Sequence, residues 1–416
     1  MKKIRLTLIA LSAVVVTLLA SSLAQAQATR TWVSGTGNDA NPCTRTQPCA
    51  TFAAALALTA PGGEISVIDA GSYGAVTITK SVTINGTGTL AGVSATSTDA
   101  VIVNAGPSDT VILRHLEITG GESGLPSGRS VNAITYLGGK ELHVEGCRIS
   151  NFSSHGINVS LSGSGALAVK DTIITGVDIG ARLTTSGGSL NASFDEVRIQ
   201  GARVGIDVLA GSATISRSSI THGTGEGVLE GVRFQSGPSL HIEDTVISNM
   251  TNGINVGLNQ AANAEVYIID SQIRNNANVG IFVSNAAPGI VNVAIERTTS
   301  ENNNFGLIGR NNARIGVSNS LFAGNAFTGI LAEVLTPGPI SIIHVVDCKV
   351  SGNGTGLSAG NSTAVNQGNL RVSGTTISFN GTGVTAGNGA ASTFADNILR
   401  DNTAPGAFSV PALTKN

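Results

Sequence analysis

The sequence has few aromatic and few charged side chains. Phe, Trp and Tyr make up 4% of its 416 residues, and Asp, Glu, Lys and Arg together make up 12%. Four cysteines are too few for a fold that depends on a disulfide scaffold. No tract of basic residues occurs, which argues against nucleic acid or an anionic membrane as a partner. Glycine is abundant instead, with 53 residues, and Val, Ile, Thr and Asn are frequent, which is typical of strands and turns.

The first 26 residues have the features of a secretory signal peptide. Lys2, Lys3 and Arg5 form a positive start, an apolar run follows to Ala20, and residues 24–26 (Ala-Gln-Ala) form a cleavage site. A retained anchor helix is the alternative, and no later segment is apolar and long enough to cross a bilayer. We expect an exported protein, periplasmic or extracellular, with no membrane span after cleavage. Removal of three cations leaves 21 basic and 26 acidic side chains, a net charge of −5.

A glycine recurs at a nearly constant interval from residue 156 to residue 383. In each repeat it precedes an apolar residue, a variable residue and a small or apolar residue. The intervals range from 22 to 27 residues and average about 25. Repeats of this length indicate a stacked solenoid, in which each unit buries its apolar face only against its neighbours. The ten glycines are Gly156, Gly180, Gly205, Gly231, Gly253, Gly280, Gly306, Gly329, Gly356 and Gly383.

The apolar residues of the repeats align in columns and alternate with polar residues, as on strands that bury one face. One column reads Val144, Val169, Phe194, Ile215, Ile242, Ile268, Ile295, Val317, Val345 and Val372. Another reads Ile149, Ile174, Ile199, Ile220, Ile247, Ile273, Ser300, Phe322, Val350 and Ile377. Three short strands per repeat, with equivalent residues stacked, predict an all-β, single-stranded parallel β-helix. No 3.6-residue periodicity recurs, which disfavours a helical or leucine-rich solenoid.

Asparagines recur three or four residues before the repeat glycines. Asn adopts left-handed backbone and bonds its own neighbourhood, so the sequence predicts a stacked asparagine ladder at one turn. The predicted members are Asn249, Asn276, Asn302, Asn325, Asn353 and Asn380.

The start of the mature chain carries a family resemblance. Its segments read Thr-Trp-Val-Ser-Gly at 31–35, Pro-Cys at 42–43 and 48–49, and Pro-Gly-Gly-Glu-Ile at 61–65. Together with the repeats, they resemble bacterial right-handed parallel β-helix proteins of the pectin-lyase-like superfamily, over nearly all of residues 29–400. The resemblance implies an N-terminal cap at 27–75 with a short helix at 52–59, coils at 76–400 and a tail at 401–416.

The catalytic signatures of enzymes in this superfamily do not occur in the chain. It has no Asp-Asp pair, no Asp-His dipeptide and no Arg-x-Pro-x-x-Arg run. Calcium-binding Gly-Gly-x-Gly-x-Asp repeats are also absent, so we expect no cofactor. The superfamily mixes lyases, hydrolases, adhesins and other proteins, and the fold therefore implies an activity only weakly.

The cysteines and histidines have structural interpretations. Cys43 and Cys49 lie in one Pro-rich loop and are predicted to form a disulfide that fixes the cap. Cys147 and Cys348 fall in one inward column eight coils apart and are predicted to be small core residues. The histidines are too far apart along the predicted coils to share a metal ion, so we expect no metal site.

The first candidate site lies on outward positions of the strand before the inter-strand bend. Asp195 and Glu243, two coils and about 10 Å apart by strand spacing, are candidate catalytic carboxylates with a water between them. Lys170, expected to pair with Asp195, is a candidate substrate-binding residue together with His241 and Tyr267.

A second outward face follows the repeat glycines. Arg182, Asp207 and Arg233 alternate in charge there, either as further substrate-binding residues or as a solvated ladder of little energetic weight.

The same column continues as an apolar strip, Phe282, Ile308 and Leu331. We expect this strip to be exposed and therefore to need a cover, either residues 401–416 or another subunit of an oligomer.

Two functions remain open at the level of sequence. The first is an exported, noncatalytic β-helix scaffold that binds a polysaccharide or cell-surface glycan or has a structural role. The second is a polysaccharide lyase or glycoside hydrolase acting on the outward face. The shortage of aromatic platforms, with a single Trp at position 32, favours the first.

Overall fold

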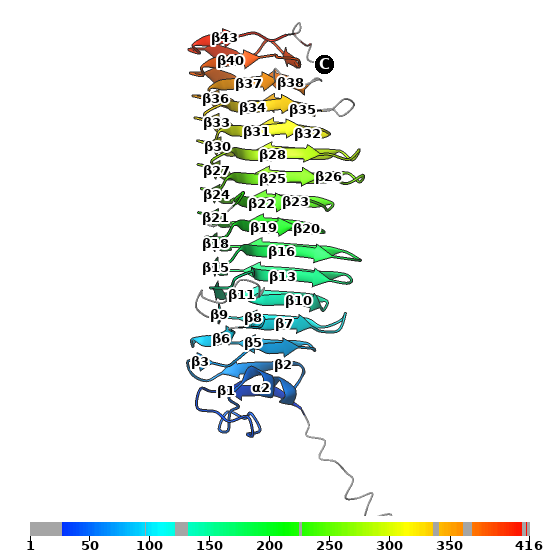
Figure 1. The fold of residues 1–416 in the computed structure, drawn as a ribbon, viewed down its shortest axis with the longest axis vertical. Helices are drawn as coiled ribbons and strands as arrows, with labels where there is room; N and C mark the ends of the chain where they lie inside the picture. Colours follow the sequence, from blue (N-terminus) through cyan, green and yellow to red (C-terminus); the bar gives the residue numbers. More distant parts are fainter. Residues whose placement is uncertain are drawn as a thin grey trace, which may run out of the picture.

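The computed structural model describes residues 27–95, 97–120, 132–223, 227–335, 341–360, 368–409 and 413. The predicted signal peptide at 1–26 lies outside these residues. The described chain is a parallel β-helix, a rod of stacked coils that runs from the cap with α2 (Phe52–Leu58) to β43 (Figure 1). No helix within the described ranges is long and apolar enough to span a membrane.

Each coil contributes one strand to each of three parallel sheets, which we name A, B and C. Sheet A contains, in order, β1 (Ala28–Val33), β2 (Thr59–Val67), β5 (Val82–Asn85), β8 (Thr110–Arg114), β11 (Glu141–Glu145), β14 (Gly165–Lys170), β17 (Leu190–Asp195), β20 (Ser212–Ser216), β23 (Ser239–Glu243), β26 (Ala264–Ile269), β29 (Val291–Glu296), β32 (Ala313–Ser318), β35 (Ser341–Val346), β38 (Gly368–Ser373) and β41 (Ala390–Thr393). Sheet B contains β3 (Gly71–Ser72), β6 (Ala91–Ala95), β9 (Leu116–Gly120), β12 (Arg148–Ser150), β15 (Ile173–Thr175), β18 (Arg198–Gln200), β21 (Ser219–Thr221), β24 (Val246–Ser248), β27 (Gln272–Arg274), β30 (Thr299–Glu301), β33 (Leu321–Ala323), β36 (Lys349–Ser351), β39 (Thr376–Ser378) and β42 (Ile398–Arg400). Sheet C contains β4 (Val76–Ile78), β7 (Val101–Asn104), β10 (Ile134–Gly138), β13 (His155–Leu161), β16 (Ile179–Thr185), β19 (Val204–Val208), β22 (Glu230–Phe234), β25 (Asn252–Leu258), β28 (Val279–Asn285), β31 (Phe305–Arg310), β34 (Thr328–Glu333), β37 (Thr355–Ala359), β40 (Thr382–Thr385) and β43 (Ala404–Gly406).

The predicted apolar columns are the core of this rod. Val144 pairs with Val169, and that strand continues the column through Phe194 and Ile215 in sheet A. All four side chains are buried. The sheet B column behaves in the same way, from Ile149 onward. Because like residues stack on like residues, one continuous apolar core follows the rod axis.

The repeat glycines stand where successive coils approach too closely for a side chain. A Cβ atom on Gly205 would lie 2.4 Å from the carbonyl oxygen of Gly231 and 2.4 Å from Cγ2 of Ile220. Gly180 faces the carbonyl oxygen of Gly205 in the same way, at 2.4 Å. The recurring glycine is therefore a steric requirement near the start of each sheet C strand.

The asparagine ladder forms, but two of its predicted members were wrong. Asn303, not Asn302, lies in the ladder, because Asn302 is the left-handed residue before it (φ +53°). Asn249 likewise has φ +57°, and Met250 holds the ladder position. Each ladder asparagine accepts the backbone N–H of the previous coil's member through Oδ1. The ladder runs through Asn276, Asn303, Asn325, Asn353, Asn380 and Asn402.

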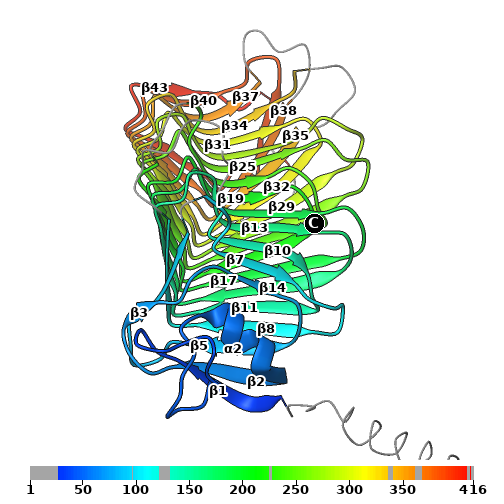
Figure 2. The ribbon, with the colours of Figure 1, turned by 60° about the horizontal axis from the view of Figure 1, so that its bottom comes forward.

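The two ends of the rod differ in structure. The predicted helix forms as α2, whose N-cap Thr51 accepts the N–H of Ala54, and it lies across the N-terminal coil (Figure 2). The predicted disulfide joins Cys43 and Cys49 in the adjoining loop. At the other end β43 pairs with β40, and Ser409 donates its N–H to the carbonyl of Ala391.

We predict that Gly205→Ala lowers the stability of the fold. The methyl group displaces backbone of the next coil, which costs about 1–3 kcal/mol. The thermal midpoint of unfolding measures this loss. Gly163→Ala is the matched control, because no heavy atom lies within 4 Å of a Cβ there. Equal midpoints for the two variants would contradict the close-approach explanation.

We predict that Cys147 and Cys348 are inert in the folded protein. Both thiols are buried, and burial raises the pKa of Cys147 to about 12 and that of Cys348 to about 11. At pH 8 the reactive thiolate is therefore scarce as well as inaccessible. Iodoacetamide followed by mass spectrometry should label neither residue natively and both after denaturation. Native labelling at a rate near that of a free thiol would refute this assignment.

Candidate functional site

The outer face of sheet C carries two parallel columns of side chains, one on each side of the repeat glycine. The residues after the glycine read Asn158, Arg182, Asp207, Arg233, Asn255, Phe282, Ile308, Leu331 and Ser358. The residues before it read His155, Ile179, Val204, Glu230, Asn252, Val279, Phe305 and Thr328. From Arg182 to Leu331 the column after the glycine therefore changes from charged to amide-bearing to apolar along the rod.

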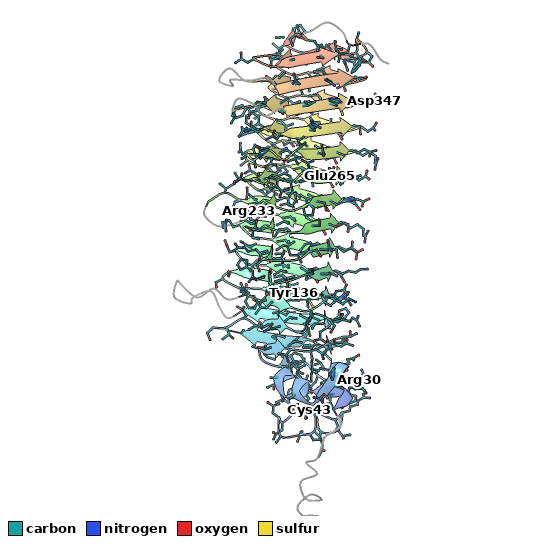
Figure 3. The ribbon with its side chains drawn as sticks, turned by 90° about the vertical axis from the view of Figure 1, so that its right-hand side faces the viewer. Arg30, Cys43, Tyr136, Arg233, Glu265 and Asp347 are labelled. Carbon is teal, nitrogen blue, oxygen red and sulfur yellow. A yellow bond between two sulfur atoms is a disulfide. The ribbon has the colours of Figure 1, made fainter. Side chains whose placement is uncertain are left out.

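Four residues form what we call the charged cluster: Arg182, Asp207, Glu230 and Arg233. Arg233 donates from Nε and Nη2 to the two carboxylate oxygens of Asp207, at 2.8 Å each. A third guanidinium nitrogen of Arg233 lies 3.3 Å from Glu230 Oε2. Hydrogen bonding to Asp207 raises the pKa of Arg233. In Figure 3 Arg233 lies between Tyr136 and Asp347 along the rod.

The two carboxylates of the charged cluster are buried and its arginines are partly buried, so the predicted solvated ladder was wrong at this point. Asp207 is 0% exposed and Glu230 is 4% exposed. Bidentate pairing with Arg233 makes that burial tolerable, since a buried carboxylate needs a charged partner and satisfied lone pairs. Asn255 donates from Nδ2 to Glu230 at 2.5 Å and completes the set.

Arg182 differs from the other arginine of the cluster. Its backbone is in register with Asp207, but within the described ranges its guanidinium makes no hydrogen bond and no ion pair. His155 lies nearby on β13, and burial lowers its pKa, which the charge of Arg182 lowers further. The neutral form of His155 is therefore favoured, and Nε of Arg182 is a buried donor without a hydrogen-bond partner among the described residues.

The apolar end of the face is hollowed. We call it the aromatic hollow, a groove of about 500 Å³. The rings of Phe305 and Phe327 lie 5.4 Å apart, and the guanidinium of Arg310 lies 5.1 Å from the Phe282 ring centroid. Arg310 also pairs with Glu333, which is 2% exposed. The lining residues are Asn252, Asn255, Asn278, Val279, Phe282, Phe305, Ile308, Arg310, Thr328, Leu331, Glu333 and Ser358.

The predicted exposed strip is largely covered. Ile308 and Leu331 are only 5% and 6% exposed, because they form a small cluster of their own with Val279. Phe282 and Phe305 pack on this cluster from outside. The expectation that residues 401–416 cover it was also wrong for the described part of that segment, since Ser409 and Leu413 bond to the backbone of β41.

The site predicted on sheet A is assembled only in part. Asp195 lies beside Lys170 in register, but its carboxylate pairs with Arg217 at 2.5 Å and accepts the hydroxyl of Ser216. The predicted Lys170–Asp195 ion pair was therefore wrong, because the neighbouring coil supplies a nearer guanidinium. Glu243 lies two coils from Asp195, as predicted.

Three of the sheet A residues do come together on β23 and β26. The rings of His241 and Tyr267 lie 5.8 Å apart, and His241 Nε2 lies 3.8 Å from Glu243 Oε2. The Glu243 side chain is 53% exposed, so the group sits on an open sheet surface.

The sequence interpretation missed Glu230, Phe305, Arg310 and Glu333. Glu230 and Phe305 each directly precede a repeat glycine, and reading that position as a second outward column would have found them. Arg310 and Glu333 are direct cross-strand partners at the ends of β31 and β34. Their opposite charges at equivalent positions of adjacent repeats could have predicted this ion pair from the sequence.

The geometry of sheet C suits binding better than proton transfer. Asp207 is fully buried and both of its oxygens accept from Arg233, so this carboxylate is not exposed to a ligand. Arg182, the asparagine amides and the phenyl rings instead offer donors, acceptors and apolar surface. No group of three or more His, Cys, Asp or Glu side chains among the described residues could hold a metal ion.

Residues 179–334 match the family model described as a right-handed beta helix region. With the coils described above, this match establishes the right-handed parallel β-helix predicted from the sequence. No curated protein sequence is detectably similar to the chain.

Among solved structures, similar chains share 12–15% of their residues with this one. The periplasmic alginate epimerase AlgG is 12% identical with a TM-score of 0.48, covering 80% of this chain and 77% of its own. The Azotobacter vinelandii mannuronan C-5 epimerase AlgE6 A-module is 14% identical with a TM-score of 0.43, covering 81% and 90%. Pectate lyase Pel9A is 15% identical with a TM-score of 0.36, covering 94% and 84%. No functional conclusion follows from likeness at this level.

We predict that Asp207→Asn destabilises the fold by up to about 3 kcal/mol, because the partly buried Arg233 then keeps only Glu230 as a counter-charge. Urea unfolding measures the loss. Asp195→Asn is the matched control, since its partner Arg217 is 53% exposed and such pairs contribute under about 1 kcal/mol. Equal losses for Asp207→Asn and Asp195→Asn would contradict the argument.

Proposed function

We propose that the protein is an exported, noncatalytic β-helix that binds an extended glycan along the outer face of sheet C. One observation carries the proposal: an unpaired guanidinium, several amides and three phenyl rings follow one another on aligned coils of a single face. Arg182, Asn255 and Phe282 stand in one column and mark these three chemistries.

The chemistry of this face fits a saccharide. Sugar rings present hydroxyl groups at their edges and C–H groups on their faces, and binding clefts match them with a few placed polar groups and aromatic surface. Asn252 accepts from Asn278 and keeps its own amide protons available for hydroxyl groups. Phe327, whose ring is 56% exposed beside Phe305, offers a platform for a ring face.

The length of the face fits a chain rather than a single sugar. Arg182 and Leu331 are six coils apart, which is about 29 Å at the spacing of paired strands. Affinity should therefore rise with oligosaccharide length and level off once the ligand spans about this distance.

The experiment is titration calorimetry of the purified protein with two size-graded ligand series. Oligogalacturonates carry carboxylates, and cello-oligosaccharides are neutral. We expect Phe327→Ala to weaken binding about three- to tenfold through loss of ring contact. Arg182→Gln should weaken binding of the carboxylate-bearing series more than that of the neutral series.

Two matched control variants distinguish binding on sheet C from binding on the other two sheets. Tyr267→Ala removes a ring that is 40% exposed on sheet A, and Arg198→Gln removes an exposed arginine on sheet B. Neither variant should change affinity. Loss of binding in Tyr267→Ala with none in Phe327→Ala would transfer the site to sheet A. Release of unsaturated products or reducing ends during the titration would overturn the noncatalytic assignment.

A further inference from the structure

A second hollow lies on the outer face of sheet A, near the C-terminal end of the rod. It measures about 350 Å³ and is lined by Arg314, Ile315, Gly316, Ile342, His344 and Arg371. These residues come from three consecutive strands, β32, β35 and β38. We call it the basic hollow.

Gly316 creates the space. It holds an outward position in register with His344, and on the preceding coil Ala294 occupies the same column. A Cβ atom at Gly316 would meet nothing closer than 3.9 Å, so the close approach that explains the repeat glycines is absent here. The glycine leaves the surface open between the surrounding basic side chains.

The charges around the basic hollow are not compensated. Arg314 and Arg371 are both exposed, and within the described ranges neither forms an ion pair or a hydrogen bond. By contrast, Arg217 and Arg297, on outer turns of the same rod, each pair with two acidic side chains. Two guanidinium groups therefore border one hollow without a counter-charge from any described residue.

His344 lies on the coil between those of the two arginines and is the direct cross-strand partner of Arg371. The pKa of His344 is low, first because the ring is desolvated and then because Arg371 is near. An anion bound between these side chains would favour the protonated imidazole, which could then donate to it.

We propose that the basic hollow is a binding site for a phosphate or sulfate group, either as the free ion or as a monoester on a small molecule. Arg314 and Arg371 are two coils apart and two residues apart along the strand, about 12 Å between Cα atoms by strand spacing, and His344 lies on the coil between them. Both guanidinium groups and the imidazole border the hollow, so a tetrahedral dianion bound there can accept from different sides. A planar carboxylate can be bound by one arginine through two hydrogen bonds, so it would make fewer contacts with the two arginines and the histidine than a phosphate or sulfate group. The half-buried side chain of Ile342 provides apolar floor for the rest of a monoester.

This site is independent of the proposed glycan binding, because it lies on another sheet and shares no residue with the face described above. A failure of either proposal leaves the other standing, and the two sets of variants do not overlap.

Titration calorimetry with inorganic phosphate, inorganic sulfate, glucose 6-phosphate and glucose tests the proposal at fixed ionic strength. We expect the two ions and the phosphate ester to bind and glucose not to bind. Tighter binding of glucose 6-phosphate than of inorganic phosphate identifies a monoester as the ligand, and the reverse order identifies the free ion. Arg371→Gln and Arg314→Gln should each weaken binding by at least about tenfold, since each removes a charge-assisted hydrogen bond.

Gly316→Val provides the test that does not depend on charge. Valine suits a strand and meets no close contact there, so the variant should keep the thermal midpoint of the parent while its side chain fills the hollow. It should abolish binding, whereas Arg198→Gln should leave it unchanged. In the parent, phosphate should raise the pKa of His344 in a proton NMR titration. No binding of phosphate, sulfate or glucose 6-phosphate by the parent, or undiminished binding by Gly316→Val, overturns the proposal.

Discussion

Stacking of coils in exact backbone register is the constraint on which the rest of the molecule depends. The glycine column shows how tightly it acts, because Gly205 and Gly231 approach to a distance that leaves no room for a methyl group. Once one coil is fixed, the backbone hydrogen bonds fix the position of the next. Every residue type that recurs at a given place in the repeat then becomes a line of side chains along the rod, whether aliphatic, amide or charged.

This constraint explains why so much of the fold could be predicted from the sequence. The columns through Val144 and Ile149 follow from two regularities. Side chains alternate between the two faces of a strand, and equivalent positions of successive repeats stack on each other; the structure contains both. The cap helix and the disulfide of Cys43 with Cys49 were also predictable, because each depends on neighbouring residues. Local sequence signals define each turn and strand, and the repeat of these units along one axis then leaves few alternative folds.

The candidate site was less predictable, because it depends on which side chain reaches which partner. The register placed Asp207 correctly between two arginines, yet it could not show that Arg233 takes both carboxylate oxygens and that Arg182 takes none. Asp195 shows the same limit, since a turn residue, Arg217, displaced the expected lysine. The aligned columns of the repeats predict which residues are neighbours on adjacent coils. Burial and ion pairing depend in addition on side-chain conformations and on turns whose lengths vary between coils.

The three faces of the rod use the same register for different purposes. Sheet B and its adjoining turn are stabilised from within, because each ladder asparagine such as Asn325 bonds the next coil's Asn353 and leaves no spare acceptor outward. The outward residues of all three sheets vary from coil to coil, as Arg148, Ile173 and Arg198 show on sheet B, and such a change does not alter the core. Chemistry on such a rod is therefore set by which residues fail to repeat. Arg182 and Gly316 are two such breaks, one a charge without a partner and the other a gap in a row of side chains, and each marks a place where a ligand can complete what the chain leaves incomplete.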